Sequence, residues 1–347
     1  MLILLLVNFA VGRWLENPLK ATALTCGVYQ CAPTSIVITD GNCGKIFENK
    51  FYYLQVCPSS STLSYCNTTS LTCVATPAAA ALQSYPGEPC VSQSDCIYGT
   101  CTASVCAGAK LNEKCTIHEQ CNPGLRCYGG SCVVQLAIGS AGCRDEQDCV
   151  NYSGCNMTYS SQNGTCIQYA SLSDNLVVTD CANGLSEMCA SGYCSHFGSW
   201  YSTLGICKSA PMTVGTVPVA CTADTDCLGT DGTNLVLSKC QCGYNNLGQS
   251  YCAPFIGDSS GINLISSWIT ALKNSTGCNT SRRSTNQCLK LTGHYSQIQS
   301  AIYGFNYYPQ IINNDACVKA IYTATYWNYD SSVILKALFS LMLLNAL

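Results

Sequence analysis

Charged side chains are scarce in this chain. Asp, Glu, Lys and Arg make up 10% of its 347 residues, and the formal net charge is −3. A protein that binds nucleic acid needs a basic face to neutralise phosphates, and the 16 Lys and Arg residues form no basic run. The composition therefore argues against a nucleic-acid partner. It leaves Ser, Thr, Asn, Gly and Tyr to form much of the surface.

Histidine is also rare, and the C-x-x-C spacing of zinc sites does not occur. The histidines are His118, His196 and His294, and the closest cysteine pair is Cys240 and Cys242. Structural zinc sites need ligand pairs about two to four residues apart. A hydrolytic triad needs a histidine beside a nucleophile and an orienting group. We therefore expect no metal, no cofactor and no catalytic residue, and we predict that the protein is not an enzyme.

Long apolar runs are confined to the two ends, and both are too short to span a bilayer easily. Residues 2–9 fit the apolar region of a secretory signal, although no Lys or Arg precedes them. This pattern predicts a signal peptide over residues 1–23, with cleavage near residue 12 or 23. The alternative is an N-terminal strand or helix that stays buried in the protein.

The apolar C-terminal tail, residues 331–347, is typical of a signal for attachment of a glycosylphosphatidylinositol (GPI) anchor. Asp330, Ser331 and Ser332 are the small or short residues at which the lipid would be attached. The alternative is an amphipathic helix that docks on the protein itself. The first interpretation predicts a membrane partner, reached through the lipid anchor.

Cysteine, by contrast, is abundant. The chain has 30 cysteines, an even number, and several recur four or five residues apart. This density indicates disulfides formed in an oxidising compartment, and therefore an extracellular protein. Two units show the spacing most clearly, and their cysteines are Cys90, Cys96, Cys101, Cys106, Cys115, Cys121, Cys127 and Cys132. We expect the first cysteine of a unit to pair with the third and the second with the fourth, although four cysteines allow three connectivities.

The spacing divides the chain into segments. We predict a six-cysteine module over residues 24–74, a linker over 75–86 and tandem disulfide-rich repeats over 87–256. The cysteines of the five repeat units fall within residues 90–106, 115–132, 143–166, 181–207 and 221–252, and each unit includes the residues that flank its cysteines. An acidic or amide residue precedes the second cysteine in most of them. The fold class is therefore small disulfide-rich modules, namely tandem short β-hairpin cysteine repeats followed by a small α-helical domain.

The helical domain is predicted over residues 257–330 and is rich in tyrosine. One helix begins near Ser259 or Ser260, with apolar positions Ile262, Ile265, Ile269 and Leu272 on one face. A second starts near Tyr295 and ends before Pro309, and a third starts near Asn314 or Asp315. Cys278 and Cys288 can close the loop between the first two helices. The fifth unit contains five cysteines, so one of them must pair outside the unit. Cys317 is also left without a partner in its own segment, and we expect these two to pair with each other.

The segments 87–106 and 115–132 resemble cysteine-rich repeats of Dickkopf N-terminal type. Tandem copies between an N-terminal signal and a short apolar tail resemble the cysteine-rich, GPI-anchored surface proteins of ciliates. The resemblance covers about half the chain and consists chiefly of spacing. It implies an extracellular, membrane-tethered protein and does not imply the Wnt antagonism of the animal ligands.

Sequons for N-linked glycosylation are frequent. Export would make them usable, and we expect most to carry N-linked glycans, which are bulky and coat a surface poor in charge. The six asparagines are Asn67, Asn151, Asn156, Asn163, Asn274 and Asn279.

These features predict a non-enzymatic extracellular cell-surface glycoprotein that serves as a coat, adhesion or filament-forming subunit. The alternative is a secreted disulfide-knotted binding module, such as a protease inhibitor or receptor ligand. We also expect homotypic association through residues 257–330 or the chain ends, with the glycosylated repeats facing solvent. The candidate interface residues are Tyr307, Tyr308, Tyr326 and Trp327, because Tyr and Trp dominate protein interfaces.

Overall fold

The computed structural model describes residues 24–58, 63–75, 83–157, 163–181, 184, 186–196, 204–307 and 315–327. All thirty cysteines lie in these ranges and form fifteen disulfides, which leaves no free thiol. The prediction of a fully bridged chain is confirmed. No helix within the described ranges combines the length and the apolar character that a membrane span requires.

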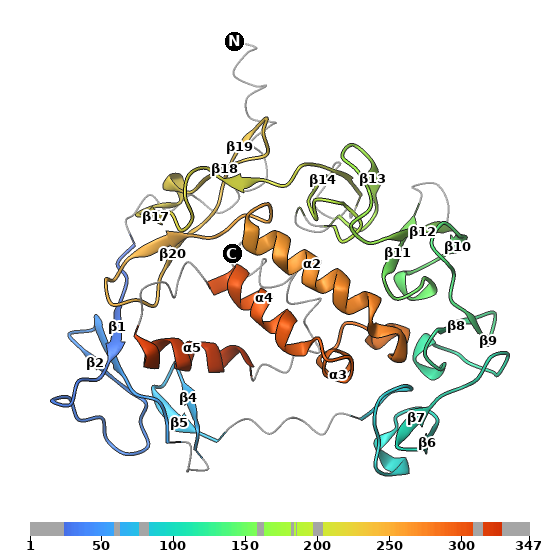
Figure 1. Ribbon diagram of the computed structural model, residues 1–347, viewed down its shortest axis with the longest axis horizontal. Helices are drawn as coiled ribbons and strands as arrows, with labels where there is room; N and C mark the ends of the chain where they lie inside the picture. Colours follow the sequence, from blue (N-terminus) through green and yellow to red (C-terminus); the bar gives the residue numbers. More distant parts are fainter. Residues whose placement is uncertain are drawn as a thin grey trace.

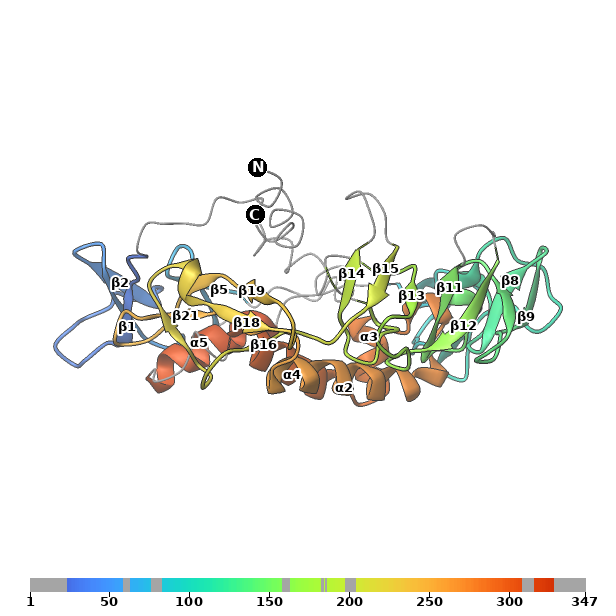
Figure 2. The same cartoon turned by 90° about the horizontal axis from the view of Figure 1, so that it is seen from above.

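The modules follow one another in an arc around a group of helices (Figure 1). The N-terminal module and the fifth unit meet at one side of the arc, and the first three units occupy the other. Seen from above, the helices run along one side of a flattened molecule (Figure 2). The predicted fold class, small disulfide-rich modules with hairpins in tandem and helices near the C-terminus, is confirmed.

The N-terminal module contains two small sheets. β1 (Val28–Cys31) pairs in parallel with β3 (Phe51–Leu54), and β2 (Gly44–Phe47) pairs antiparallel with β3. β4 (Tyr65–Asn67) and β5 (Thr72–Val74) form a hairpin. Two of its bridges are internal, Cys43–Cys66 and Cys57–Cys73.

Each repeat unit is a hairpin held by two crossed bridges. In the first four units the first cysteine pairs with the third and the second with the fourth, as the spacing predicts. The fifth unit has five cysteines, and there Cys221 pairs with Cys240 and Cys227 with Cys252. The first two units contain the hairpins β6–β7 (Thr100–Thr102, Val105–Ala107) and β8–β9 (Leu125–Tyr128, Ser131–Val134). Short loops make this pairing possible without a large apolar core.

The later units add strands to the hairpin. The third has β10 (Ala141–Cys143), β11 (Ser153–Met157) and β12 (Gly164–Gln168). The fourth has β13 (Val177–Val178), β14 (Cys194–His196) and β15 (Gly205–Cys207). The fifth holds two sheets, β16–β18–β19 (Met212–Thr213, Leu228–Thr230, Leu235–Leu237) and β17–β21–β20 (Ala220–Cys221, Ser250–Cys252, Cys240–Cys242).

The residue before the second cysteine has a structural role. It ends a short 3-10 turn, and its side chain accepts hydrogen bonds from backbone N–H groups that the turn leaves unpaired. The Asp95 carboxylate accepts from Val91 and Ser92, and that of Asp226 accepts from Thr222. The turns are η1 (Gln93–Asp95), η2 (His118–Gln120), η3 (Glu146–Asp148) and η4 (Asp224–Asp226). The acidic or amide residue therefore closes the loop between the first two cysteines.

The helices are α2 (Ser259–Lys273), α3 (Asn286–Leu291), α4 (Tyr295–Tyr307) and α5 (Ala316–Trp327), with short turns η5 (Ser275–Gly277) and η6 (Thr280–Arg282) after α2. The buried face of α2 follows Leu264, Trp268 and Leu272, whereas Ile262 is exposed. The prediction that Ile262 lies on the buried face is therefore wrong. Leu264, Trp268 and Leu272 are spaced four residues apart, so they share one face of the helix, and Ile262 lies outside it.

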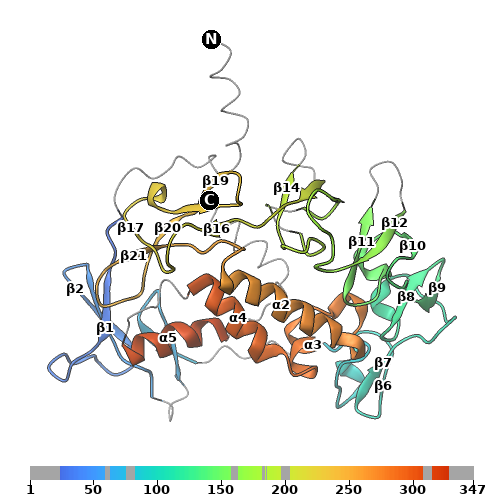
Figure 3. The same cartoon turned by 45° about the horizontal axis from the view of Figure 1, so that its top comes forward.

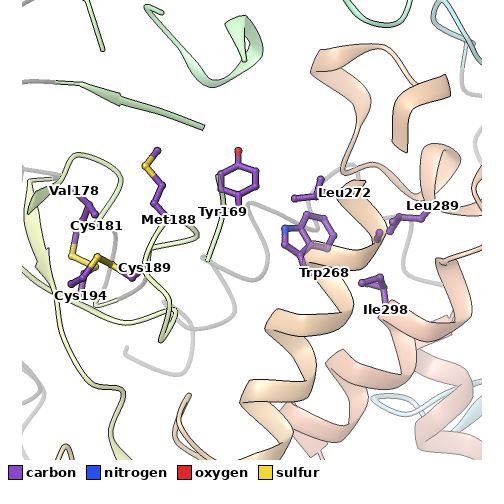
Figure 4. Packing of buried hydrophobic residues seen from close by; sticks show 12 residues of the cluster. Tyr169, Val178, Cys181, Met188, Cys189, Cys194, Trp268, Leu272, Leu289 and Ile298 are labelled. Atoms are coloured by element: carbon purple, nitrogen blue, oxygen red, sulfur yellow. A yellow bond between two sulfur atoms is a disulfide. The ribbon is translucent and has the colours of Figure 1, made fainter. Parts of the chain in front are cut away.

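The helices share their core with the repeats. Trp268, Leu272 and Ile298 belong to one buried cluster together with Tyr169 and Met188 of the third and fourth units (Figure 4). In that view Tyr169 lies between Met188 and the helices. The helical region is thus a centre on which the repeats pack, and the three-quarter view shows it inside the arc (Figure 3).

Two long-range bridges correct one expectation. Cys242, the odd cysteine of the fifth unit, pairs with Cys26, and Cys317 pairs with Cys31. The expected pairing of Cys317 with the fifth unit is wrong because β1 lies between the two partners. The Tyr29 N–H of β1 donates to the Asn245 carbonyl on the side of the fifth unit, 2.9 Å, while the Cys31 N–H donates to the Asp315 carboxylate beside α5, 2.9 Å.

Candidate interaction surface

A short loop between Cys278 and Cys288, which are themselves bridged, contacts several of the repeat units. Asn279 in this loop is fully buried and donates its amide hydrogens to carbonyl oxygens of the second unit, those of Cys121 at 2.8 Å and Glu119 at 3.2 Å. Thr280 accepts from the Gln135 amide, 2.7 Å, and donates to the Gln147 carbonyl, 3.1 Å. The loop therefore satisfies backbone groups that the repeats leave open.

Two adjacent arginines extend these contacts to other units. The Arg282 guanidinium lies over the Tyr85 ring, 4.4 Å from its centroid, and its Nε is 3.6 Å from the buried Glu88 carboxylate of the first unit. Arg283 donates to the Tyr169 hydroxyl, 2.7 Å, in the third unit. Because arginine presents several donors in a fixed fork, one short loop can bind separate modules in a defined geometry.

Neighbouring units are also joined directly. Arg126 of the second unit and Asp148 of the third form a buried ion pair, 2.7 Å between Nη1 and Oδ1. His118 spans the same junction, because its Nε2 lies 3.3 Å from the Asp145 carboxylate and its Nδ1 accepts from the Cys127 N–H. The Nε2 atom of His118 thus contacts the third unit, whereas the Nδ1 atom holds the ring within the second unit.

The junction of the third and fourth units with the helices concentrates acidic groups. Burial raises the pKa of Asp180 to about 6, although the hydrogen bond from Ser186 opposes the shift. Burial also raises the pKa of Glu187 well above its usual range, and the charges of Glu146 and Asp180 add to this effect. Arg283 is the cation that lowers the pKa of Glu187. This junction can therefore take up protons in mildly acidic solution.

The six sequons fall into three structural groups. Asn163 and Asn274 are exposed, and the Asn274 side-chain amide donates to the Thr270 carbonyl, 2.8 Å. Asn67 and Asn156 are half-buried, and each side-chain oxygen accepts a backbone N–H, from Thr69 at 3.0 Å and from Thr179 at 3.1 Å.

Asn151 and Asn279 do not fit the expectation of glycosylation. Their side chains are 4% and 0% exposed, and the Asn151 amide donates to the Ser275 carbonyl, 2.7 Å. A bulky sugar on either nitrogen would break these contacts, and there is no room for it in this packing. The sequon pattern cannot distinguish these positions because it contains no information about burial.

Other predicted site residues lie at the edges of the described structure. Tyr307 ends α4, and Tyr326 and Trp327 lie at the end of α5. Tyr308, the attachment residues Asp330, Ser331 and Ser332, the predicted signal over 1–23 and the tail over 331–347 lie outside the described residues.

One sheet presents an apolar surface to solvent. We define the fifth-unit apolar face as Met212, Val214, Leu228 and Leu235, whose residues are 52%, 48%, 39% and 69% exposed. They belong to the sheet β16–β18–β19 and the residue that follows β16. Clustered exposed apolar side chains of this kind mark interaction sites more often than scattered ones.

The sequence analysis did not predict that the loop between Cys278 and Cys288 contacts several repeat units. A signal was present, since Arg282 and Arg283 are adjacent in a chain that contains few cations. Two neighbouring arginines inside a ten-residue disulfide loop indicate a rigid donor of hydrogen bonds. Which modules they contact depends on the packing.

Comparison with known proteins gives one weak similarity. The chain is 24% identical over 176 residues to cell-cell adhesion glycoprotein 64 of Heterostelium pallidum, a region that covers 44% of this chain and 52% of that protein. It thus spans about half the length of the curated relative it matches. No protein-family pattern and no solved structure matches the chain.

This similarity agrees with the disulfide framework, and both are consistent with an extracellular adhesion or surface protein. It supports the surface-protein part of the expected resemblance. It gives no specific support to the ciliate or Dickkopf families.

Proposed function

We propose that this chain is a non-enzymatic adhesion glycoprotein of the cell surface, tethered to the membrane through a lipid anchor at its C-terminal tail. The observation that carries the proposal is the similarity to a cell-cell adhesion glycoprotein. Among the roles that the composition allows, namely coat, adhesion and filament subunit, the similarity favours adhesion.

The covalent framework suits this role. An adhesion protein must keep its binding surface in place while cells pull on it. Bridges Cys26–Cys242 and Cys31–Cys317 join the N-terminal module to the fifth unit and to α5, so the arc is closed covalently. Each bridge stabilises the fold by about 2–4 kcal/mol, largely by restricting the unfolded chain.

The contacts of His118 and His294 and of the cysteines support a role without catalysis. His118 is engaged at both ring nitrogens, and His294 Nδ1 lies 3.2 Å from the Gln297 side-chain oxygen. Every sulfur of the thirty cysteines is in a disulfide, so no thiolate nucleophile is available.

Expression of the full chain on the surface of non-adherent cells tests the proposal. Expressing cells should form clumps in suspension, and phospholipase C specific for GPI anchors should disperse them and release the protein. A matched chain truncated after residue 330 should be found in the medium and should leave cells single. Cells that display the full chain and stay single would contradict the adhesion role. Resistance of the clumps to the phospholipase would contradict the anchor alone.

A further inference from the structure

The fifth-unit apolar face lies on one side of a single sheet. Directly paired residues of an antiparallel sheet point to the same side. Met212 pairs with Thr230, which pairs with Leu235, and Leu228 pairs with Leu237. The Val214 N–H donates to the Leu228 carbonyl, 2.9 Å, so the chain continues in the same register beyond β16.

The other side of this sheet is covered and fixed to the helices. A Cβ atom at Gly229 would lie 2.5 Å from the Phe255 ring, which shows how closely the ring packs there. Asp258, just before α2, accepts from the Thr213 N–H at 2.8 Å and from its hydroxyl at 2.6 Å. The exposed side is therefore held rigidly, and its exposure does not result from a loose sheet.

The face carries no charge. None of the strands β16, β18 and β19 contains an ionisable side chain, and the nearby Asp231 carboxylate is turned into its own hairpin loop, where it accepts from the N–H groups of Thr233 and Asn234. A neutral apolar surface gives an acidic or basic partner nothing to pair with. Its own copy, by contrast, meets it without like-charge repulsion.

The area of the face also suits a weak contact that is repeated many times between two cells. Four partly exposed side chains amount to a patch on the order of a few hundred Å². Two such patches bury less than the roughly 1,200 Å² of a stable interface, so a single contact is weak. Many copies on two opposed membranes can still hold cells together, because linked weak contacts add through avidity. No sequon lies between residues 204 and 257, so no N-linked glycan originates in this unit.

We propose that the fifth-unit apolar face is the homophilic contact, which packs against the same face of a second copy of this chain across a twofold axis. This inference rests on the proposed adhesion function and names the surface and the partner. The contact is isologous, so each residue of the face meets residues of the same set on the partner copy.

Charge substitution at Leu235 tests the surface. Leu235→Asp places like charges on both sides of the contact, so clumping of cells that express this variant should fall at least tenfold. Leu235→Lys should have the same effect. A mixture of the two cell populations should clump again, because the charges are then opposite. Val91→Asp is the matched control, since Val91 is 97% exposed in the first unit, and it should clump as the unsubstituted chain does.

The outcomes separate the two proposals. Secretion and surface staining of each variant check that it folds. If cells with the unsubstituted chain clump and Leu235→Asp cells clump equally, this surface is wrong while adhesion stands. If expressing cells bind non-expressing cells as well as each other, the partner is not a second copy. If the unsubstituted chain gives no clumps, the adhesion function itself fails.

Discussion

Buried polar side chains, rather than apolar ones, specify how the modules of this protein meet. Asn279, Thr280 and Arg283 lie in one short loop, and their side chains donate hydrogen bonds to backbone or side-chain groups of separate repeat units. A buried hydrogen bond has a modest net value, but an unpaired buried group costs about 1–3 kcal/mol. Such contacts therefore exclude wrong arrangements of the modules more strongly than they stabilise the right one.

Replacement of Asn279 should test this directly. Asn279→Ala leaves buried carbonyls of the second unit unpaired and should lower the free energy of unfolding by about 2–3 kcal/mol. Asn274→Ala is the control because Asn274 is an exposed sequon asparagine nearby, and its effect should stay within about 0.5 kcal/mol. Denaturant titration of the disulfide-intact proteins measures both. Equal effects, or a glycan on the Asn279 peptide by mass spectrometry, would contradict the buried placement.

The stability should rise as the pH falls from 7 to 5. The pKa of Asp180 is about 6 in the folded protein against an ordinary value of 3.8, so the folded state binds this proton more tightly than the unfolded state. The penalty for the charged form is present above pH 6 and disappears as the pH falls toward 4. Glu187, whose pKa is also raised, acts in the same direction.

Thermal unfolding followed by circular dichroism at several pH values measures this dependence. We expect a gain of about 1–2 kcal/mol between pH 7 and pH 5, below the full linkage value because Asp180 is in part accessible to water. Asp180→Asn should flatten the pH profile by removing one titrating group. A variant that keeps the full slope would show that other groups cause it.

At the scale of elements, helices and hairpins in this protein depend on covalent attachment to their neighbours. α5 packs on the N-terminal module through Val318 and Ile321, which share a cluster with Leu54 and Leu71. Cys31–Cys317 crosses the same contact. The bridge and the apolar cluster therefore stabilise one docking arrangement together.

Removal of that bridge should release α5 selectively. The double variant Cys31→Ala, Cys317→Ala should lose about 2–4 kcal/mol of stability, and amide hydrogens of α5 should exchange faster. The double variant Cys90→Ala, Cys101→Ala removes a local bridge with a separation of 11 residues and should affect the first unit alone. Unchanged protection of α5 in the first variant would show that its apolar contacts suffice.

At the scale of the whole molecule, the fold is a set of small cores joined in an arc. In the part of the chain that the structure describes, three of the six core clusters consist of buried cysteines with a few partly buried apolar neighbours. Such modules are too small to fold by apolar burial alone. The disulfides are therefore a condition of the fold and do more than strengthen it.

Reduction should accordingly unfold the protein without added denaturant. We expect loss of the near-ultraviolet circular dichroism signal and rapid hydrogen exchange in all five repeat units after treatment with a thiol reductant. Reoxidation in the presence of a disulfide isomerase should restore both. A reduced chain that still melts cooperatively would show that the apolar clusters carry more of the stability than this argument assigns to them.

The sequence by itself determined the local structure of this protein. Cysteines ten to eighteen residues apart close small loops, and their spacing favoured the pairing found in the first four units among the three connectivities that four cysteines allow. Among the described residues, apolar periodicity predicted α2, α4 and α5, with Pro309 after the end of α4, and it did not predict the short helix α3. These features depend on residues that are near one another in the chain.

Only the tertiary structure decided what lies far apart in sequence. The partners of Cys242 and Cys317, the burial of Asn151 and Asn279 and the exposure of Leu235 depend on which modules meet. The odd number of cysteines in the fifth unit and in the helical segment showed that one cysteine of each pairs elsewhere, but the prediction that these two pair with each other was wrong. The physical reason is that long-range contacts are selected by packing and hydrogen bonding between folded modules, and no local pattern in the chain encodes those.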